Sequence, residues 1–401
     1  MELKTIAFYN WVYPGGGGET VTRNLGHFFR SKGFRIVIYA GTLFEDILTE
    51  EDRRDFTRIT VPLKAQGNKQ IDYDAFCQSL NSEQVDCLIV QGMVHTDFAR
   101  IRRDVGCKII FCIHSIPLWE VRAARSKRCS DLPKPTLLKK LEFLLFRQPT
   151  NLLTNKLKHR VLKSYTEVLP HLDRLVMLCP EYKEEMQLQI RKSGYPGSKA
   201  PDEKFMSISN PLLPPLFPVD RETPKEKTVL YVGRLKREDK RVDRLLTIWQ
   251  KIERSVPEWR LQILGRGEEM ETLRKQAARL GLKRIEFMGH QTDVVPYYRR
   301  ASFICLTSNF EGLPMCLIEA QQYGVIPVAF DSFAAIRGIT ENGKAGIMVP
   351  AFNKRKYAAR LKAVLLDNDQ QEQMRKHCYD APSKYDIQVI GQQWLDLFSE
   401  L

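Results

Sequence analysis

The chain has 401 residues, of which 43% are hydrophobic and 27% are charged, and its net charge at pH 7 is +14. This composition excludes a disordered chain, and the length predicts two or three folded domains. No apolar run approaches the roughly 18 residues of a membrane-spanning helix, and the apolar stretch at the N-terminus is too short and too early for a signal peptide, so we expect it to form a first β-strand.

The first half of the chain alternates strands and helices. A strand at residues 4–9 is followed by a glycine-rich loop and a helix from about 20 to 32. Further strands are expected at residues 34–39, 86–91, 108–114 and 174–178. Continuous Val, Ile and Leu runs separated by helical stretches are typical of a parallel sheet that is covered on both faces.

Prolines then interrupt this alternation. Residues 210–224 contain five prolines in fifteen positions, which excludes a helix interior or a central strand and marks a linker. Beyond it, strands are expected at residues 228–232, 260–264, 284–288, 303–306 and 325–330. In open α/β sheets ligands bind at the carboxyl ends of the strands, so the site is to be sought there.

These elements predict an α/β protein with two Rossmann-like, doubly wound domains. We expect a first domain at residues 1–208 and a second domain at residues 209–384, with a helix at about 385–401 that packs back on the first domain.

Nine cysteines are scattered singly, mostly among apolar residues, as is typical of buried thiols in a reducing compartment. Their odd number and the lack of paired CxxC spacing argue against a disulfide framework or a zinc site. They are Cys77, Cys87, Cys107, Cys112, Cys129, Cys179, Cys305, Cys316 and Cys378.

Two cations follow the first strand of the second half. Gly233 and Arg234 come directly after that strand, and Lys240 stands six residues after Arg234. Two cations on one strand-to-helix loop can hold a diphosphate and stabilise the charge that develops as it leaves. The alternative is an ordinary lysine-rich turn.

A second motif, EGLPMCLIE at residues 311–319, follows the strand at 303–306. Gly312 permits a tight backbone, and Pro314 stands where a helix begins. The free N–H groups of this helix are suited to bind a diphosphate or sugar hydroxyls, Glu319 to accept from a ribose diol, and Glu311 to reach a sugar hydroxyl. Taken singly, either glutamate could be a surface cap.

Together these motifs resemble those of a known family. Glu311 and Glu319, eight residues apart around a GLP turn, are similar to the EX7E motif of retaining glycosyltransferases in sequence family 4, which have the GT-B fold. The spacing from Arg234 to Lys240 and Asp243 resembles the donor-phosphate loop of that family. The resemblance also includes the glycine loop at residues 265–267 and Asn210-Pro211, and it extends over most of residues 205–350. It departs in one place, because the usual glycine after the lysine is Arg241 here.

The resemblance implies that residues 209–384 bind a nucleotide-sugar donor and that residues 1–208 face the acceptor. No metal is expected, because the cations and the helix N–H groups can stabilise the leaving diphosphate and no DxD stands at a strand end. Arg234 and Lys240 would bind the diphosphate, Glu319 the ribose, and Glu311 the transferred sugar. The implied catalytic residues are His114, Glu311, Arg234 and Lys240. The implied donor-binding residues are Gly17, Gly233, Arg234, Lys240, Gly265, Arg266, Glu311, Gly312, Leu313, Pro314, Met315, Cys316, Leu317 and Glu319.

The first half carries weaker motifs. Residues 15–18 are four glycines that open a helix, without Walker or GxGxxG spacing, and the family has a similar turn that faces the diphosphate and the acceptor. His114, at the carboxyl end of a strand, stands where the family has a histidine near the reacting sugar. The alternatives are a flexible turn and a histidine bound by local backbone. His95 is a lesser candidate for the same role, and His290, in the second half, is a lesser candidate for a contact with the nucleotide base.

Residues 121–160 carry eleven Lys or Arg and two acidic residues, a net charge of +9. Within this segment, leucines 137, 138, 141, 144 and 145 fall on one helical face beside Lys139, Lys140 and Arg147. Such a helix can lie on an anionic membrane surface, and the alternatives are a helix packed into the core and a plain solvated basic face.

We therefore expect a retaining glycosyltransferase that is cytoplasmic or peripheral on the inner membrane face. It would transfer a sugar from a UDP- or GDP-sugar to a glycan or lipid-linked acceptor in cell-surface polysaccharide or glycolipid synthesis, without a metal or other cofactor and without a nucleic-acid partner. One alternative is a sugar-nucleotide epimerase or hydrolase of the same fold, which would turn over donor without acceptor. The other is a non-enzymatic basic module that binds membrane or nucleic acid, which would leave the paired glutamates without a role.

Overall fold

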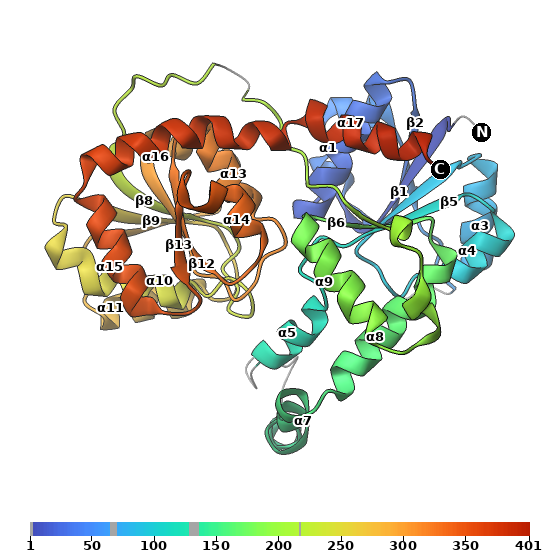
Figure 1. Ribbon diagram of the computed structural model, residues 1–401, viewed down its shortest axis with the longest axis horizontal. Coiled ribbons are helices and arrows are strands. Elements are labelled where there is room, and N and C mark those ends of the chain that lie inside the picture. Colours follow the sequence, from blue (N-terminus) through green and yellow to red (C-terminus); the bar gives the residue numbers. More distant parts are fainter. Residues whose placement is uncertain (1–2, 65–69, 128–135, 216–217) are drawn as a thin grey trace. The chain divides into compact units, whose positions relative to one another are not determined.

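The computed structural model describes residues 3–64, 70–127, 136–215 and 218–401, and the chain divides into two compact units (Figure 1). The first unit contains residues 1–121, 153–213 and 385–401, and the second contains residues 122–152 and 214–384. Residues 122–152, which we expected in the first domain, therefore belong to the second unit. Among the described residues, no helix combines the length and the apolarity needed to cross a bilayer.

The first unit is built on a seven-stranded parallel sheet of order β3-β2-β1-β4-β5-β6-β7. The five strands predicted from sequence are confirmed, although β1 runs four residues beyond its predicted end, and β5 ends before His114. β3 and β7 were not predicted. The strands are β1 (Thr5–Tyr13), β2 (Arg35–Leu43), β3 (Phe56–Thr60), β4 (Cys87–Gln91), β5 (Lys108–Cys112), β6 (Arg174–Met177) and β7 (Phe205–Ser207).

Helices cover both faces of this sheet. On one face Phe8 stacks against Phe29 of α1, and on the other Tyr9 packs against Phe76 of α3, because successive residues of a strand point to opposite faces. The helices are α1 (Gly17–Ser31), α2 (Glu50–Asp55), α3 (Tyr73–Ser82), α4 (Phe98–Asp104), α5 (Trp119–Ser126, assigned to the second unit from residue 122 on), α8 (Lys156–Val168), α9 (Pro180–Arg191) and α17 (Ile387–Ser399).

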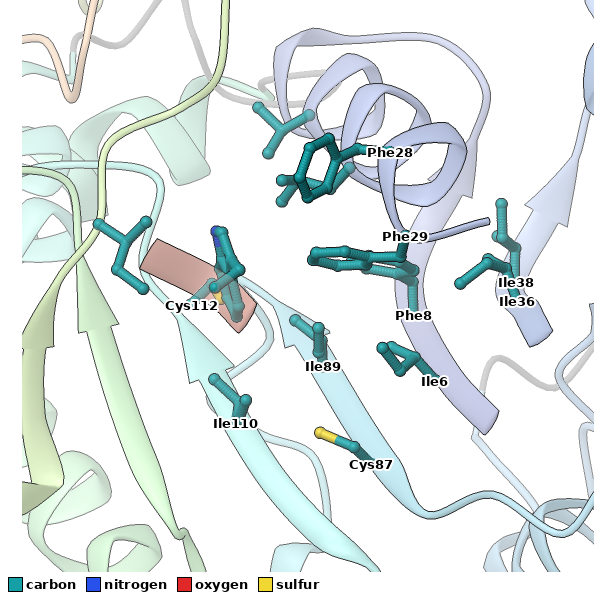
Figure 2. Packing of buried hydrophobic residues seen from close by; sticks show 14 of the residues in the cluster. Ile6, Phe8, Phe28, Phe29, Ile36, Ile38, Cys87, Ile89, Ile110 and Cys112 are labelled. Atoms are coloured by element: carbon teal, nitrogen blue, oxygen red, sulfur yellow. The ribbon is translucent and has the colours of Figure 1, made fainter. Parts of the chain in front are cut away.

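The C-terminal helix α17 packs on α1. Trp394 and Phe398 contact Phe29 edge-on, with ring centroids 6.3 and 5.1 Å away. Figure 2 shows the core beneath, where residues of α1, β1, β2, β4 and β5 meet. The last helix thus completes the hydrophobic core of the first unit, and the backbone pairing of Leu212 with Asp386 brings the chain back to it.

The second unit contains a six-stranded parallel sheet of order β10-β9-β8-β11-β12-β13. The five strands predicted here are confirmed, and β13 was not predicted. The strands are β8 (Glu226–Val232), β9 (Arg260–Leu264), β10 (Ile285–Gly289), β11 (Ala301–Leu306), β12 (Ile326–Asp331) and β13 (Ile347–Pro350). The helices are α6 (Leu137–Glu142), the π-helix η3 (Phe143–Arg147), α7 (Gln148–Leu153), α10 (Val242–Ile252), α11 (Met270–Arg279), α12 (Val295–Arg300), α13 (Met315–Gln322), α14 (Ala335–Ile339), α15 (Lys354–Leu365) and α16 (Asn368–Asp380).

Each sheet has one point at which the strand order reverses. In the first unit β1 lies between β2 and β4, and in the second β8 lies between β9 and β11. The loops that leave the two strands at such a point diverge to opposite faces of the sheet, and ligands of doubly wound folds bind there. The predicted motifs of the second unit follow β8 and β11, on the two sides of its switch point.

The cysteines are consistent with a reduced interior. All eight cysteines in the described part of the chain are free, and seven of them are buried. Cys129 lies outside the described residues.

Candidate active site at the second switch point

The loops that follow β8 and β11 are tied together by hydrogen bonds. The Asn309 backbone N–H donates to the Asp239 carbonyl at 2.6 Å, and its side-chain Nδ2 donates to the Glu238 carbonyl at 2.7 Å. These bonds join the end of the predicted phosphate loop to the residues just before the EGLP turn. The switch point therefore holds one joined site rather than two separate loops.

Lys240 and Glu311 form the centre of this site. The Lys240 Nζ lies 2.8 Å from both carboxylate oxygens of Glu311, and the Ser308 hydroxyl donates to Oε1 of the same carboxylate at 2.6 Å. The side chains of Lys240 and Glu311 are only 16% and 9% exposed. Two residues that the sequence assigned to one site from separate motifs thus meet as a mostly buried ion pair.

The ion pair keeps Lys240 positively charged. Burial lowers the pKa of Lys240, but the charges and hydrogen bonds of its neighbours, Glu311 first, outweigh burial and raise that pKa above its usual value. A charged ammonium in a site shielded from water attracts phosphate strongly. Lys240 is therefore ready to bind an anion that displaces or shares its carboxylate partner.

Glycines allow the phosphate loop to pack against its neighbour. A Cβ on Gly265 would lie 1.8 Å from the Gly233 carbonyl oxygen, and one on Gly267 would lie 2.3 Å from the Leu235 carbonyl oxygen. Both Gly233 and Gly265 also have positive φ, at 153° and 145°. The Leu235 N–H donates to the Arg266 carbonyl at 2.9 Å, so the backbones of the two loops are in direct contact. The glycines fix the shape of the loop that carries Lys240.

Glu319 lies one turn into α13. Its Oε2 accepts from the Tyr298 hydroxyl at 3.1 Å, and burial raises the pKa of its carboxyl group. Burial also raises the pKa of the Cys316 thiol to about 12, with smaller effects from Lys240 and the two glutamates. The thiol is therefore protonated at pH 7. The charges of Lys240, Glu311 and Glu319 all affect the Cys316 thiol, so these three side chains lie near the start of α13.

The other predicted donor residues differ in exposure. Gly312, Leu313 and Pro314 are buried, and Pro314 caps α13, which begins at Met315, one position after the predicted helix start. Met315 and Cys316 are half-buried, and Leu317, whose N–H donates to the Pro314 carbonyl, is buried.

Arg234 and Arg266 are solvent-exposed. The Arg234 side chain is 73% exposed and lies 3.4 Å from Asp239. Arg266 contributes its backbone carbonyl to the loop contact, while its side chain is exposed. These arginines are thus able to reach a ligand without losing a buried contact.

The candidates of the first unit lie at its own switch point. Gly17 is the first residue of α1, and a Cβ on Gly18 would lie 3.8 Å from Cδ2 of His114, so the glycine turn and His114 are neighbours. Burial lowers the pKa of His114 to about 4, opposed in part by the Asn210 side chain. His95, like His290 of the second unit, is exposed.

Sequence reasoning missed several partners of these residues. Ser308 and Asn309 stand just before the EGLP turn and could have been found from that position. Asp239 directly precedes Lys240. Tyr298 and Gln91, which contact Glu319 and His114, carry no sequence signal, because their roles depend on how strands and helices lie side by side.

Comparisons with known proteins agree with this architecture. The fold is GT-B, and residues 216–380 match the family described as glycosyl transferases group 1. The chain is 26% identical over 351 residues to the lipopolysaccharide 1,6-galactosyltransferase of Salmonella typhimurium, which covers 85% of this chain and 84% of that protein. The structure of HepE of Anabaena in complex with UDP-glucose matches 99% of this chain and 100% of that one, with a TM-score of 0.72 and 15% identity.

An uncharacterized glycosyltransferase of Haemophilus influenzae is 32% identical over 199 residues, which are 48% of this chain and 56% of that protein. The chain spans about half the length, or less, of several curated relatives that it matches. The family match covers the unit that holds the Lys240–Glu311 pair.

Proposed function

We propose that the protein is a retaining, metal-independent glycosyltransferase that moves a hexosyl group from a UDP- or GDP-sugar to a glycan or lipid-linked acceptor. The observation that carries this proposal is the buried Lys240–Glu311 pair at the switch point of the second unit. A cation that can bind a diphosphate and a carboxylate that can bind a sugar lie 2.8 Å apart in this pair, and the pair belongs to the unit that matches a glycosyltransferase family, which supports the proposal.

In the proposed reaction the bond between the anomeric carbon and the β-phosphate oxygen breaks as a bond from the acceptor oxygen forms on the same face. The acceptor proton passes to the leaving phosphate oxygen. Lys240 and Arg234 stabilise the negative charge that develops on the diphosphate, together with the N–H groups at the start of α13. These groups supply the charge that a metal ion supplies in other transferases, so none is required.

The remaining residues position the donor. Glu319 accepts from the ribose hydroxyls, and Glu311 with the backbone of residues 312–316 binds the transferred sugar. On donor binding, the Lys240 ammonium exchanges part of its contact with Glu311 for phosphate, which frees carboxylate lone pairs for sugar hydroxyls. His114 acts near the reacting sugar as a neutral group. HepE of Anabaena, which has the same fold, binds UDP-glucose, and this supports a UDP-sugar donor.

Thermal unfolding in the presence of UDP-, GDP- and ADP-sugars tests the donor class. One donor group should raise the Tm in proportion to its affinity, and a saturating donor at about 100 times its Kd adds about 2.7 kcal/mol of stability. EDTA should leave that shift unchanged. No stabilisation by any nucleotide sugar would contradict the proposal.

Labelled donor distinguishes transfer from the rival reactions. A glycosyltransferase consumes donor quickly only when acceptor is present, whereas an epimerase or hydrolase of this fold turns over donor alone. Nuclear magnetic resonance of the product should show the same anomeric configuration as the donor. An inverted product would remove the retaining assignment while leaving the transferase.

The acceptor proposal includes a peripheral membrane contact through the leucine face, which we define as Leu137, Leu138, Leu141, Leu144, Leu145, Phe146 and Leu152. The five leucines between 137 and 145 are 45–77% exposed, which contradicts a core-packed helix. Phe143 is buried and anchors the segment, while Lys139, Lys140 and Arg147 stand exposed between the leucines. Exposed apolar side chains interleaved with cations match an anionic bilayer better than an uncharged protein surface.

Vesicle cosedimentation tests this contact. We expect binding to phosphatidylglycerol-containing vesicles and weak binding to pure phosphatidylcholine. Leu144→Ser with Leu145→Ser should lower binding by about tenfold or more, because burying each leucine contributes about 1.5 kcal/mol or more. Leu366→Ser is the matched control, since Leu366 is 61% exposed and Leu145 is 64% exposed. Unchanged binding by the double variant would contradict the contact, and leucine-dependent dimerisation without vesicles would indicate a second copy instead.

A further inference from the structure

The His114 side chain is held by an amide of the neighbouring strand. In the parallel pair of β4 and β5, Gln91 lies opposite Cys112, and each of these residues ends its strand. His114 is two residues further on, so its ring lies beside the Gln91 side chain. The His114 Nε2 is hydrogen-bonded to the Gln91 Oε1, and Gln91 is only 9% exposed.

A second amide approaches from the other side of the sheet. After β7 the chain runs along the end of β6, where the Ile208 N–H donates to the Met177 carbonyl and the Ser209 hydroxyl to the Leu178 carbonyl. This path brings Asn210 to the imidazole, with which its side chain interacts. Gln91, His114 and Asn210 line one small cavity of about 10 Å³ together with Trp394. A cavity of that size holds about one water and no sugar.

The hydrogen bond decides where the imidazole carries its proton. Burial lowers the pKa of His114 to about 4, so the ring is neutral at pH 7 and carries a single N–H. A glutamine Oε1 can only accept a hydrogen bond. The proton therefore lies on Nε2, and the lone pair lies on Nδ1.

We propose that Gln91 is a positioning residue that holds His114 in one ring orientation and in the Nε2–H tautomer. The ring edge at Cδ2 then faces Gly18 of the glycine turn, where an added Cβ would lie 3.8 Å away. Gln91 thereby sets the surface against which this turn and the start of α1 rest. Its effect on catalysis depends on the proposed function, but its effect on the tautomer does not.

Nuclear magnetic resonance of the full chain with ¹⁵N-labelled histidine tests the tautomer directly. His114→Asn identifies the His114 signals by their loss. In the wild-type protein at pH 7, we expect a protonated Nε2 and an unprotonated Nδ1. Gln91→Leu, which keeps the size but has no acceptor, should give a mixture of tautomers. Gln91→Glu keeps an acceptor and adds a charge, so the Nε2 proton should remain and the pKa of His114 should rise.

Kinetics with the donor found by thermal unfolding complete the test. Gln91→Leu should lower kcat on the order of tenfold with little change in donor KM, because the imidazole is misplaced rather than the donor site altered. Gln91→Glu should recover much of this loss. The double variant Gln91→Leu with His114→Asn should be no slower than His114→Asn alone, since Gln91 acts through that ring.

Two results would overturn the proposal. One is a wild-type His114 protonated on Nδ1, and the other is a Gln91→Leu protein whose His114 signals match those of the wild type. Circular dichroism controls for folding, and Gln91→Glu provides the comparison if Gln91→Leu does not fold. A protein that binds no nucleotide sugar yet shows the Nε2–H tautomer would contradict the proposed function and leave this inference standing.

Discussion

The glycines at the two switch points differ in what surrounds them. In the second unit, a Cβ on Gly265 or Gly267 would lie 1.8 or 2.3 Å from backbone oxygens of the neighbouring loop. In the first unit, a Cβ on Gly17 would meet no atom within 4 Å, and one on Gly15 would meet only the Val12 side chain at 3.7 Å. Gly265 and Gly267 are therefore required by the fold, whereas Gly15 and Gly17 leave room for something else to approach.

The titratable groups at the two switch points also differ. In the second unit a protonated lysine faces a carboxylate, and the raised pKa of Lys240 keeps it charged. In the first unit a neutral histidine faces an amide, and burial lowers the pKa of His114 to about 4. One site therefore carries a buried charge that can attract an anion, and the other carries none.

Alanine substitutions of one glycine from each unit test this contrast most strongly. Gly265→Ala should lower the free energy of unfolding by about 4 kcal/mol, because the Cβ overlaps a backbone oxygen that cannot move independently. Gly17→Ala should change it by about 0.5 kcal/mol or less, and should favour α1, since alanine is the better helix former. Urea unfolding measures both.

Gly17→Ala should affect transfer activity although it hardly affects stability. If the open side of Gly17 admits donor or acceptor, Gly17→Ala should lose transfer activity on the order of tenfold while remaining folded. A Gly17→Ala protein with full activity would show that its open space has no function.

Removing either member of the ion pair should abolish most transfer. Glu311→Gln and Lys240→Met should each lower kcat/KM by about 10²–10³-fold, the usual loss for one group that stabilises developing charge. Glu268→Gln is the matched control, because Glu268 is exposed on the adjacent glycine loop. Activity of Glu311→Gln within a factor of about two of the wild type would place the reacting sugar elsewhere.

The neutral histidine predicts a pH dependence of stability. The pKa of His114 is about 4 in the folded protein, and that of an unperturbed histidine is 6.5. The unfolded chain therefore binds more protons than the folded protein between these two pH values. Stability should therefore rise with pH from about 4 to 6.5, by up to about 3 kcal/mol from this group. His114→Asn should remove that part of the slope. An identical slope in both proteins would show that His114 is protonated when folded.

Lys225 of the second unit predicts a pH dependence of stability in a higher pH range. Burial, with help from Arg375, lowers the pKa of Lys225 to about 7 from 10.5. Its contribution to the free energy of unfolding should therefore increase between pH 7 and 10.5. Lys225→Met should reduce the slope of stability against pH in that range and leave the slope below pH 7 unchanged.

The fold was largely predictable because the buried strands are continuous apolar runs. The strands that were missed have specific reasons. β7 has only three residues, and β3, with Arg58 and two threonines, is partly exposed along most of its length, so neither shows the apolar pattern. The assignment of residues 122–152 to the second unit depends on distant packing that no local pattern encodes.

The candidate site was predictable where its chemistry is local in sequence. The spacing within each motif indicated Lys240 and Glu311, and the switch point explains why two loops 71 residues apart meet. The partners Tyr298 and Gln91 were not predictable, because each is supplied by a neighbouring element. Arg234 shows a further limit, since a sequence motif does not indicate how far its side chain extends into solvent.

The smallest effect concerns the one departure from the family pattern. Arg241 has φ 52° and ψ 44°, a left-handed conformation that favours the glycine usual at this position, and its guanidinium makes two 2.9 Å hydrogen bonds to Asp243. Arg241→Gly relieves strain of about 1 kcal/mol but loses this ion pair, so its net effect should be small. Arg241→Ala loses the ion pair and keeps the strain, so it should be less stable than Arg241→Gly by about 1 kcal/mol. Because the two variants share the loss of the guanidinium, their difference in urea unfolding isolates the backbone. Equal stabilities of Arg241→Gly and Arg241→Ala would mean that the backbone at residue 241 is not left-handed, and that the loop holding Lys240 has another shape.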